Sequence, residues 1–261
     1  MIDSCAPLRC FASQLADHNE AAPLVQWMEE WYSAAGQGVV AGLLDTSFDE
    51  QIPDLVGADL VIRNFAASAE ENLYLAEHGT YSVTILIGQG RHQIRGIAPR
   101  ACLFIAKVVG TDGVATPRAV IEAIDWLVSS GVQIIVLPLG DPIEREEISQ
   151  LIEKVYEYGV VVFAAAGNGH PDPLIFPARH PLAIAVGAAD AHGNLLPECS
   201  RLPRLDLVAP GWKIPAPIRG RVIRRRSGSS VACVIAAGTA ILALSAGAIP
   251  TPTNRMNVLS T

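Results

Sequence analysis

Five short apolar runs, separated by helix-like sequence, limit the fold of this chain more than any other feature. A strand buried on both faces of a sheet has such an uninterrupted apolar sequence, whereas a strand with one exposed face alternates. We therefore expect five strands of a mainly parallel sheet: GVVAGLL (38–44), ACLFIAKVV (101–109), VQIIVLPL (132–139), VVVFAAA (160–166) and LAIAVGA (182–188).

Two segments between these runs have the sequence of amphipathic helices. TPRAVIEAIDWLVSS places Thr116 as the N-cap, Pro117 at the first helical position and Gly131 just after the end. EREEISQLIEKVYEYG begins with acidic residues, continues with apolar residues at helical spacing and ends at Gly159. Strands that alternate with helices predict an α/β fold, with helices on both faces of a mainly parallel central sheet.

Composition excludes several classes of function. The chain has 261 residues, of which 17% are charged, and its net charge is −7. Such an acidic chain lacks the basic footprint of a nucleic-acid binder, so we expect no nucleic-acid partner. Its five cysteines include no CxxC pair, which argues against a zinc cluster and favours a reducing compartment. The N-terminus has no basic segment followed by an apolar one, so we expect no signal peptide and a cytoplasmic protein.

The segment from Ser227 to Asn254 contains no charged residue and has three possible interpretations: a membrane span, a buried helix, or a helix that presents a serine to a substrate. About 20 apolar residues suffice to span a bilayer. However, this segment is rich in Ala, Gly, Ser and Thr, is followed by Pro250 and Pro252, and lacks flanking Trp or Tyr. We therefore expect a buried helix and no membrane partner.

Three motifs carry side chains for nucleophilic catalysis. GLLDTSFD places Asp45 at a strand end, EHGTYSVTILIG places His78 at a helix start, and SGSSVACVIAAG places Ser230 in the first turn of the charge-free helix. A serine hydroxyl needs a neighbouring base, which histidine supplies, and a buried carboxylate orients the imidazole. Taken singly, Asp45 could instead be a turn residue, His78 a helix cap and Ser230 an N-cap.

These motifs, in the order Asp, His, Ser, make the chain resemble the subtilisin-like serine proteases, the subtilase family. The resemblance extends from about Val39 to Gly247 and includes GIAPRACLFIAKV, IFPARHPLAIAVGAAD and DLVAPGWKI. It implies a subtilisin-like three-layer fold and peptide cleavage through an acyl-enzyme, with Asp45, His78 and Ser230 as the catalytic residues.

The resemblance also implies the residues that surround the reaction. Asn168 and the backbone N–H of Ser230 would form the oxyanion hole, although Asn168 by itself could be a loop residue. The segments beside the substrate would supply these substrate-binding residues: Pro138, Leu139, Gly140, Ala164, Ala165, Ala166 and Gly167.

The expected catalytic domain covers residues 38–249. Residues 1–37 form an N-terminal extension with an expected amphipathic helix that carries Leu24, Trp27, Met28 and Trp31 on one face, and residues 250–261 form a loose tail. Packing of that helix on the domain surface is the simpler interpretation, and docking of a partner is the alternative.

Four positions depart from the family pattern: Ser47, Tyr81, Pro138 and Val234. None of the departures removes a catalytic group, but Pro138 has no backbone N–H for pairing with a substrate. Two alternatives to a hydrolase therefore stay open. One is a degenerate subtilase that acts as a peptide-binding module, and the other is an acyl-transferring relative similar to a macrocyclase.

The loop IGQGRHQIR (87–95) indicates whether the protein binds a metal ion. Many secreted subtilases bind calcium here, but this loop has no Asn or Asp and carries Arg91 and Arg95, so we expect no metal ion. The expected acyl-enzyme chemistry requires no cofactor. The chain is more similar to the small subtilases that cut leaders from ribosomally made peptides, as in cyanobactin pathways. A peptide or precursor peptide is the expected partner.

The segment IRGRVIRRRSGSS is basic and directly precedes the nucleophile motif. A solvated hairpin is one interpretation, and a patch that attracts an acidic peptide is the other. The patch would consist of Arg219, Arg221, Arg224, Arg225 and Arg226.

Overall fold

The computed structural model describes residues 33–66, 76–218 and 222–248. The expected N-terminal helix with Leu24, Trp27, Met28 and Trp31, the tail after Pro250, and two patch residues, Arg219 and Arg221, lie outside the described residues. The domain boundaries therefore stay predictions.

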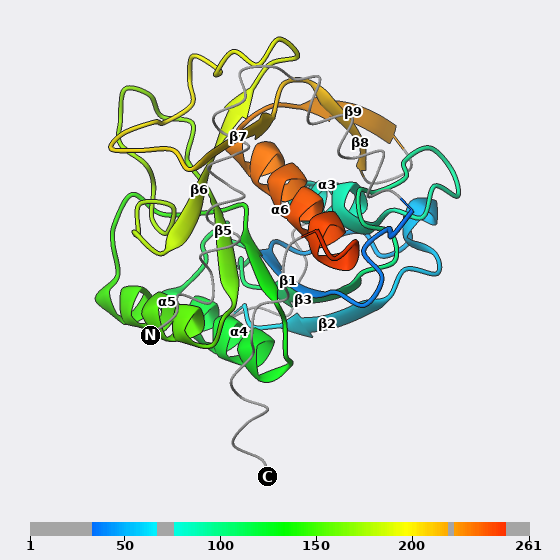
Figure 1. Ribbon diagram of the computed structural model, residues 1–261, viewed down its shortest axis with the longest axis horizontal. Helices are drawn as coiled ribbons and strands as arrows, with labels where there is room; N and C mark the ends of the chain where they lie inside the picture. The colour runs from blue at the N-terminus through cyan, green and yellow to red at the C-terminus, as the bar shows by residue number, and fades with distance from the viewer. Residues whose placement is uncertain (1–32, 67–75, 219–221, 249–261) are drawn as a thin grey trace.

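The described residues form a seven-stranded sheet in the order β2-β3-β1-β4-β5-β6-β7, and every neighbouring pair is parallel (Figure 1). The five expected strands are confirmed, with ends shifted by one to two residues: β1 (Val40–Asp45), β3 (Cys102–Lys107), β4 (Ile134–Leu137), β5 (Val161–Ala165) and β6 (Ala183–Ala189). Two strands were not predicted. β2 (Leu60–Asn64) is largely exposed at the sheet edge, and β7 (Leu207–Pro210) has only four residues.

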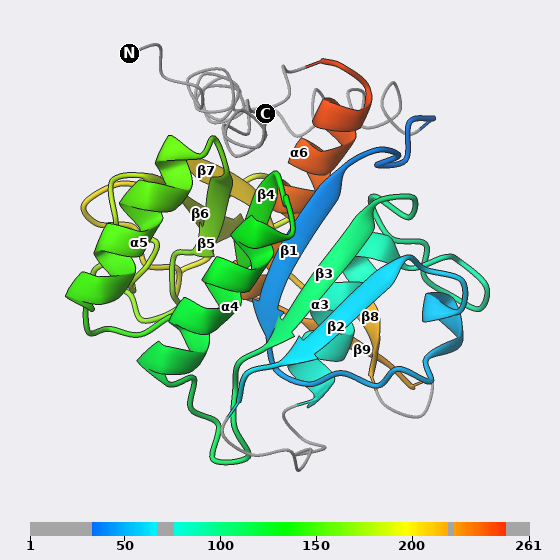
Figure 2. The ribbon, with the colours of Figure 1, turned by 90° about the horizontal axis from the view of Figure 1, so that it is seen from below.

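Helices cover both faces of the sheet, as expected (Figure 2). One face carries α4 (Pro117–Ser129) and α5 (Glu146–Glu157), and the other carries α3 (Ala76–Ile87) and α6 (Ser229–Ser245). The hydroxyl of Thr116 accepts the N–H of Ala119 over 3.2 Å, which is the predicted N-cap of α4. A single 3₁₀ turn, η1 (Pro53–Leu55), follows β1.

The charge-free segment forms α6, which packs against β4, β5, β6 and β7. Nearly all of its residues are buried. Because many of its side chains are small, the helix can pack closely against the sheet. Within the described ranges, no helix is long and apolar enough to cross a membrane. The interpretation as a buried helix is therefore correct.

Between β7 and α6 the chain makes an antiparallel pair of strands, β8 (Ile214–Ile218) and β9 (Val222–Arg226). The first residue of β8, Ile214, pairs with the last residue of β9, Arg226. β8 contacts α3, so the basic segment lies beside the helix that carries His78.

Candidate active site

Asp45 and His78 meet at the carboxyl end of β1. Nδ1 of His78 lies 2.6 Å from Oδ1 of Asp45, and the backbone N–H of Thr46 donates to the same oxygen over 2.6 Å. The Asp45 side chain is 0% exposed, whereas the His78 side chain is 33% exposed. Because the carboxylate holds the proton on Nδ1, the lone pair of Nε2 is available to accept a proton.

The two motifs that contain Asp45 and His78 are also joined directly. The N–H of Gly79 donates to Oγ1 of Thr46 over 2.9 Å, and the N–H of Asp49 donates to Oγ1 of Thr80 over 2.8 Å. A Cβ on Gly79 would lie 2.5 Å from the carbonyl oxygen of Ser47. The glycine that follows His78 therefore permits the close approach of α3 to the end of β1.

Charges around the ring set the basicity of His78. The Asp45 carboxylate raises the pKa of His78 above its ordinary value of 6.5, while burial and the positive charge of Arg226 act in the opposite direction. A raised pKa makes the imidazole a stronger base, which suits a group that accepts a proton from a hydroxyl.

Three serines stand at the start of α6, and their contacts differ. Oγ of Ser227 accepts the N–H of Lys213 over 2.9 Å, and Oγ of Ser229 accepts the N–H of Gly167 over 3.0 Å. Ser229 is 1% exposed, but Ser230 is half-buried, and its hydroxyl makes no hydrogen bond to any other described residue. Of the three hydroxyls, that of Ser230 is the one left for a reaction.

Asn168 follows β5 and lies against the first turn of α6. Its Oδ1 accepts the N–H of Ser229 over 2.9 Å. Gly228 has φ 133°, and a Cβ there would lie 3.0 Å from Nδ2 of Asn168, so this position requires glycine. Oδ1 is thus occupied, whereas the NH₂ group of Asn168 donates no hydrogen bond to a described residue. Together with the backbone N–H groups of the first turn, it offers donors to an anion.

His78 and Ser230 lie on two helices, α3 and α6, that contact each other. The ring of His78 is hydrogen-bonded to Asp45, and among the described residues no hydrogen bond joins it to Ser230. Such a hydrogen bond is often long before substrate binds.

Comparison with known proteins gives the family. The model of the subtilase family matches residues 36–259. This chain belongs to the subtilase family. It is 30% identical over 217 residues to subtilisin DY of Bacillus licheniformis, which covers 80% of this chain and 78% of the relative. It is 32% identical over 220 residues to subtilisin E of Bacillus subtilis (strain 168), covering 80% and 56%.

This subtilase is also similar to several solved structures. The protease domain of PatA is 26% identical, with a TM-score of 0.75 and coverage of 85% of this chain and 86% of that one. The prenylagaramide maturation protease PagA is 26% identical, with a TM-score of 0.75 and coverage of 89% and 86%. The macrocyclase domain of PatG, at 20% identity and a TM-score of 0.77, shares the fold. As a subtilase, the protein is a serine protease.

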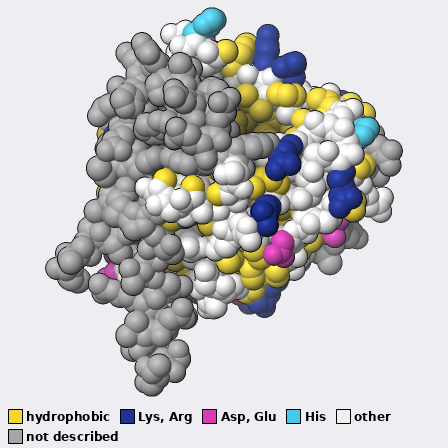
Figure 3. All heavy atoms as spheres, turned by 45° about the vertical axis from the view of Figure 1, so that its right-hand side comes forward, with side chains coloured by type: hydrophobic (Ala, Val, Ile, Leu, Met, Phe, Trp, Pro, Cys, Tyr) yellow, Lys and Arg dark blue, Asp and Glu magenta, His cyan; other side chains and the backbone are white. Residues whose placement is uncertain are grey.

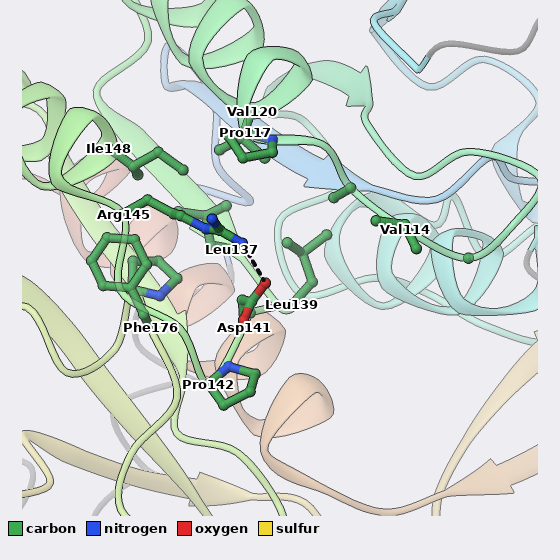
Figure 4. A pocket seen from close by; sticks show the side chains of 14 residues that line it. Val114, Pro117, Val120, Leu137, Leu139, Asp141, Pro142, Arg145, Ile148 and Phe176 are labelled. Atoms are coloured by element: carbon green, nitrogen blue, oxygen red, sulfur yellow. Dashed lines mark ion pairs between the residues drawn. The ribbon is translucent and has the colours of Figure 1, made fainter.

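The subtilase has an apolar pocket of about 290 Å³ beyond the end of β4 (Figure 4). Its walls come from α4 through Pro117 and Val120, from α5 through Ile148, and from Phe176. Of the substrate-binding residues expected from the sequence, Leu139 and Gly140 line this pocket. The others do not line it: Pro138, Ala164, Ala165, Ala166 and Gly167, all of which are buried.

One polar pair stands among these apolar walls. Asp141 and Arg145 form an ion pair at 3.9 Å, and both side chains are partly exposed. Figure 4 shows the pair between Leu137, Leu139 and Pro142. The sequence did not indicate either residue, since both stand in a polar segment between a strand and a helix.

The three described arginines of the basic segment have different surroundings. Arg224 is exposed, Arg225 donates to the carbonyl of Lys213 over 3.0 Å, and Nη2 of Arg226 lies 2.5 Å from Oε2 of Glu77. Figure 3 shows that Lys and Arg side chains on the face that includes the right-hand side of Figure 1 are dispersed and do not form one block. The three described arginines therefore have three different environments, and their joint action on an acidic peptide stays a prediction.

Tyr81, a departure from the family pattern, holds this hairpin in place. Its buried phenol donates a hydrogen bond to the carbonyl of Ile214 in β8. Burial raises the pKa of Tyr81 to about 12, although a hydrogen bond from the backbone of Arg226 opposes the shift. The tyrosine thus links α3 to both strands of the hairpin.

The loop at residues 87–95 closes on an acidic residue that sequence reasoning missed. The buried carboxylate of Asp54 accepts the N–H groups of His92, Gln93 and Ile94 at 2.7–3.2 Å. These N–H groups carry partial positive charge and point into the loop, so they attract a carboxylate and repel a cation. The Asp54 carboxylate therefore orders the loop. Within the described residues, no group of three or more His, Cys, Asp or Glu could hold a metal ion.

Proposed function

We propose that this subtilase is an endopeptidase in which Asp45, His78 and Ser230 form the catalytic triad. The observation that carries the proposal is the 2.6 Å hydrogen bond between Asp45 and His78. The helix of His78 contacts the helix of Ser230, whose hydroxyl has no hydrogen-bond partner among the described residues. Asp45 orients the imidazole and stabilises its protonated form, and His78 is the base and then the acid.

The reaction proceeds in two halves. Oγ of Ser230 attacks the carbonyl carbon of the scissile bond while Nε2 of His78 takes the hydroxyl proton. The tetrahedral oxyanion receives hydrogen bonds from the NH₂ group of Asn168 and the backbone N–H of Ser230. His78 then gives its proton to the leaving amine, the C–N bond breaks, and an ester to Ser230 remains. Water, deprotonated by His78, hydrolyses that ester and restores the hydroxyl.

We propose processing of a specific peptide or precursor peptide as the biological role, in the cytoplasm. Similarity to the structures of PatA and the maturation protease PagA supports this role, as do the unpaired cysteines Cys102, Cys199 and Cys233, which suit a reducing compartment. The 290 Å³ pocket, lined by Leu139 and Gly140, is proposed to hold an apolar side chain of the substrate.

A library of peptides derived from a whole proteome tests both levels of the proposal. The purified protein is incubated with the library, and new termini are identified by mass spectrometry. We expect cleavage at a small set of related sites, and no cleavage by Ser230→Ala. Cleavage at many unrelated sites would contradict the processing role alone. No cleavage by a folded protein that still binds peptides would replace the hydrolase with a peptide-binding module.

A further inference from the structure

Arg226 connects the hairpin to α3, the helix that carries His78, through an ion pair. It is the last residue of β9, four positions before Ser230, and its ion-pair partner Glu77 immediately precedes His78. Its positive charge lowers the pKa of His78.

The position of Arg226 is fixed at two points. Its backbone hydrogen-bonds to the buried phenol of Tyr81, and its Nη2 lies 2.5 Å from Oε2 of Glu77. Both partners belong to α3, the helix of His78. A side chain held in this way loses little conformational entropy when it binds a further group.

The guanidinium has donors to spare. It carries five N–H groups, of which the bond to Glu77 engages one nitrogen. Nε is buried without a partner, and the side chain makes no other hydrogen bond to a described residue. With 37% of the side chain exposed, the guanidinium is open to a second acceptor.

The position of the hairpin determines which part of a peptide reaches Arg226. The residues that line the apolar pocket belong to α4, α5, the end of β4 and nearby loops. The strands β8 and β9 lie next to α3, on the side of α6 away from α4 and α5 (Figures 1 and 2). His78 must reach the departing amine, since it supplies that proton. A peptide with its acyl side toward the pocket therefore passes its leaving segment by His78 and Arg226.

We infer that Arg226 is a specificity-determining residue that binds the carboxylate of an acidic side chain just after the scissile bond. This inference rests on the proposed endopeptidase function. The acid accepts a charge-assisted hydrogen bond from the free donors of the guanidinium, beside the carboxylate of Glu77. Glu77 both holds the arginine and repels the incoming acid, so it limits the strength of the preference.

Arg224 and Arg225 provide matched comparisons. Each carries the same charge within two residues of Arg226, but Arg224 is exposed and Arg225 bonds to the carbonyl of Lys213. If a diffuse basic surface selected the substrate, all three arginines would contribute similarly, and salt would remove the effect. If direct contact with one arginine selects the substrate, only the replacement of Arg226 changes the preference for an acidic peptide.

The experiment compares peptides that are identical except for Glu, Gln or Lys directly after the cut, built on a site found with the proteome-derived library. We expect the wild type to cleave the Glu peptide about fivefold faster than the Gln peptide, in kcat/KM, and to retain most of this ratio in about 1 M salt. Arg226→Gln brings the ratio to about one, Arg224→Gln leaves it unchanged, and Glu77→Gln increases it.

The arms of this experiment separate the possible failures. The assignment of Arg226 would be overturned if the wild type cleaved the Glu and Gln peptides at about the same rate, or if Arg226→Gln left their ratio unchanged. In both cases, cleavage itself would still support the endopeptidase function. If Glu77→Gln and Arg226→Gln both slow all three peptides equally, the ion pair only supports His78, and the inference is wrong. Absence of cleavage of every peptide would remove the proposed function and the inference together.

Discussion

The backbone N–H of Ser229 donates to Oδ1 of Asn168 over 2.9 Å, and this contact fixes the orientation of the amide. An amide whose oxygen is engaged presents its NH₂ group elsewhere. Here that group stands beside the first turn of α6, where unsatisfied N–H groups and the helix dipole already favour negative charge. This arrangement supports the proposal that Asn168 and the first turn of α6 bind a developing oxyanion.

Replacement of Asn168 by alanine should lower kcat by about 10²–10³ and change KM little, because the lost donor acts on the transition state. Steady-state kinetics on one peptide substrate measures both constants. Asn168→Asp, which keeps the shape but offers no NH₂ donor, should be as slow as the alanine variant. A loss below about tenfold in both variants would show that Asn168 does not bind the oxyanion.

The pH dependence of activity should reflect the raised pKa of His78. Only the neutral imidazole accepts the Ser230 proton, so kcat/KM should fall as the pH drops through that pKa, above the ordinary 6.5. Because Arg226 lowers this pKa, Arg226→Gln should move the acid limb to higher pH, whereas Arg224→Gln should leave it in place. Profiles of kcat/KM on an uncharged peptide give the comparison. A limb that moves to lower pH in Arg226→Gln would contradict the electrostatic account.

Asp54 should stabilise the fold without any metal. Asp54→Asn places an amide where three N–H groups converge, and we expect a loss of about 2–3 kcal/mol in the free energy of unfolding, measured by urea denaturation. Asp141→Asn, at a half-exposed carboxylate, should cost less than about 1 kcal/mol. A chelator should leave the melting temperature of the wild type unchanged. A large decrease would mean that a bound metal ion stabilises the protein, contrary to this expectation.

Gly79→Ala tests the contact between the Asp45 and His78 motifs. The added methyl group would lie 2.5 Å from the carbonyl oxygen of Ser47, so backbone must move, at a cost of about 1–3 kcal/mol. Because His78 is the adjacent residue, kcat should fall as well. Gly110→Ala, whose nearest neighbour is the exposed carboxylate of Asp112, is the matched control for both measurements. Unchanged kcat in Gly79→Ala would show that the contact does not position His78.

The sequence predicted the buried parts of this fold well because burial leaves a local pattern. The doubly covered strands β1, β3, β4, β5 and β6 are continuous apolar runs, and Thr116 with Pro117 marks the start of α4. The exposed edge strand β2 has no such pattern, since its burial is slight. The order of the motifs along the chain also led to the correct prediction that Asp45 and His78 lie close together.

The remaining contacts depend on the tertiary fold. Arg226 and Glu77 are 149 positions apart, and Tyr81 and Ile214 are 133 apart, so no window of sequence relates them. Asp54 was missed for the same reason, because its N–H donors lie about 40 residues later. The different environments of Arg224, Arg225 and Arg226 depend on tertiary contacts in the same way, and the attraction of an acidic peptide by the basic segment stays a prediction.

The most direct test of the account is to label the purified protein with a fluorophosphonate and to measure the intact mass and the labelled peptide. The adjacent serine gives the control, because Ser229 is buried and its hydroxyl is bonded to the N–H of Gly167, whereas the hydroxyl of Ser230 is unpaired among the described residues. We expect one adduct on Ser230, lost in Ser230→Ala and His78→Ala but retained in Ser229→Ala. An adduct on Ser229, or none in a folded protein, would contradict the assignment of Ser230 as the nucleophile.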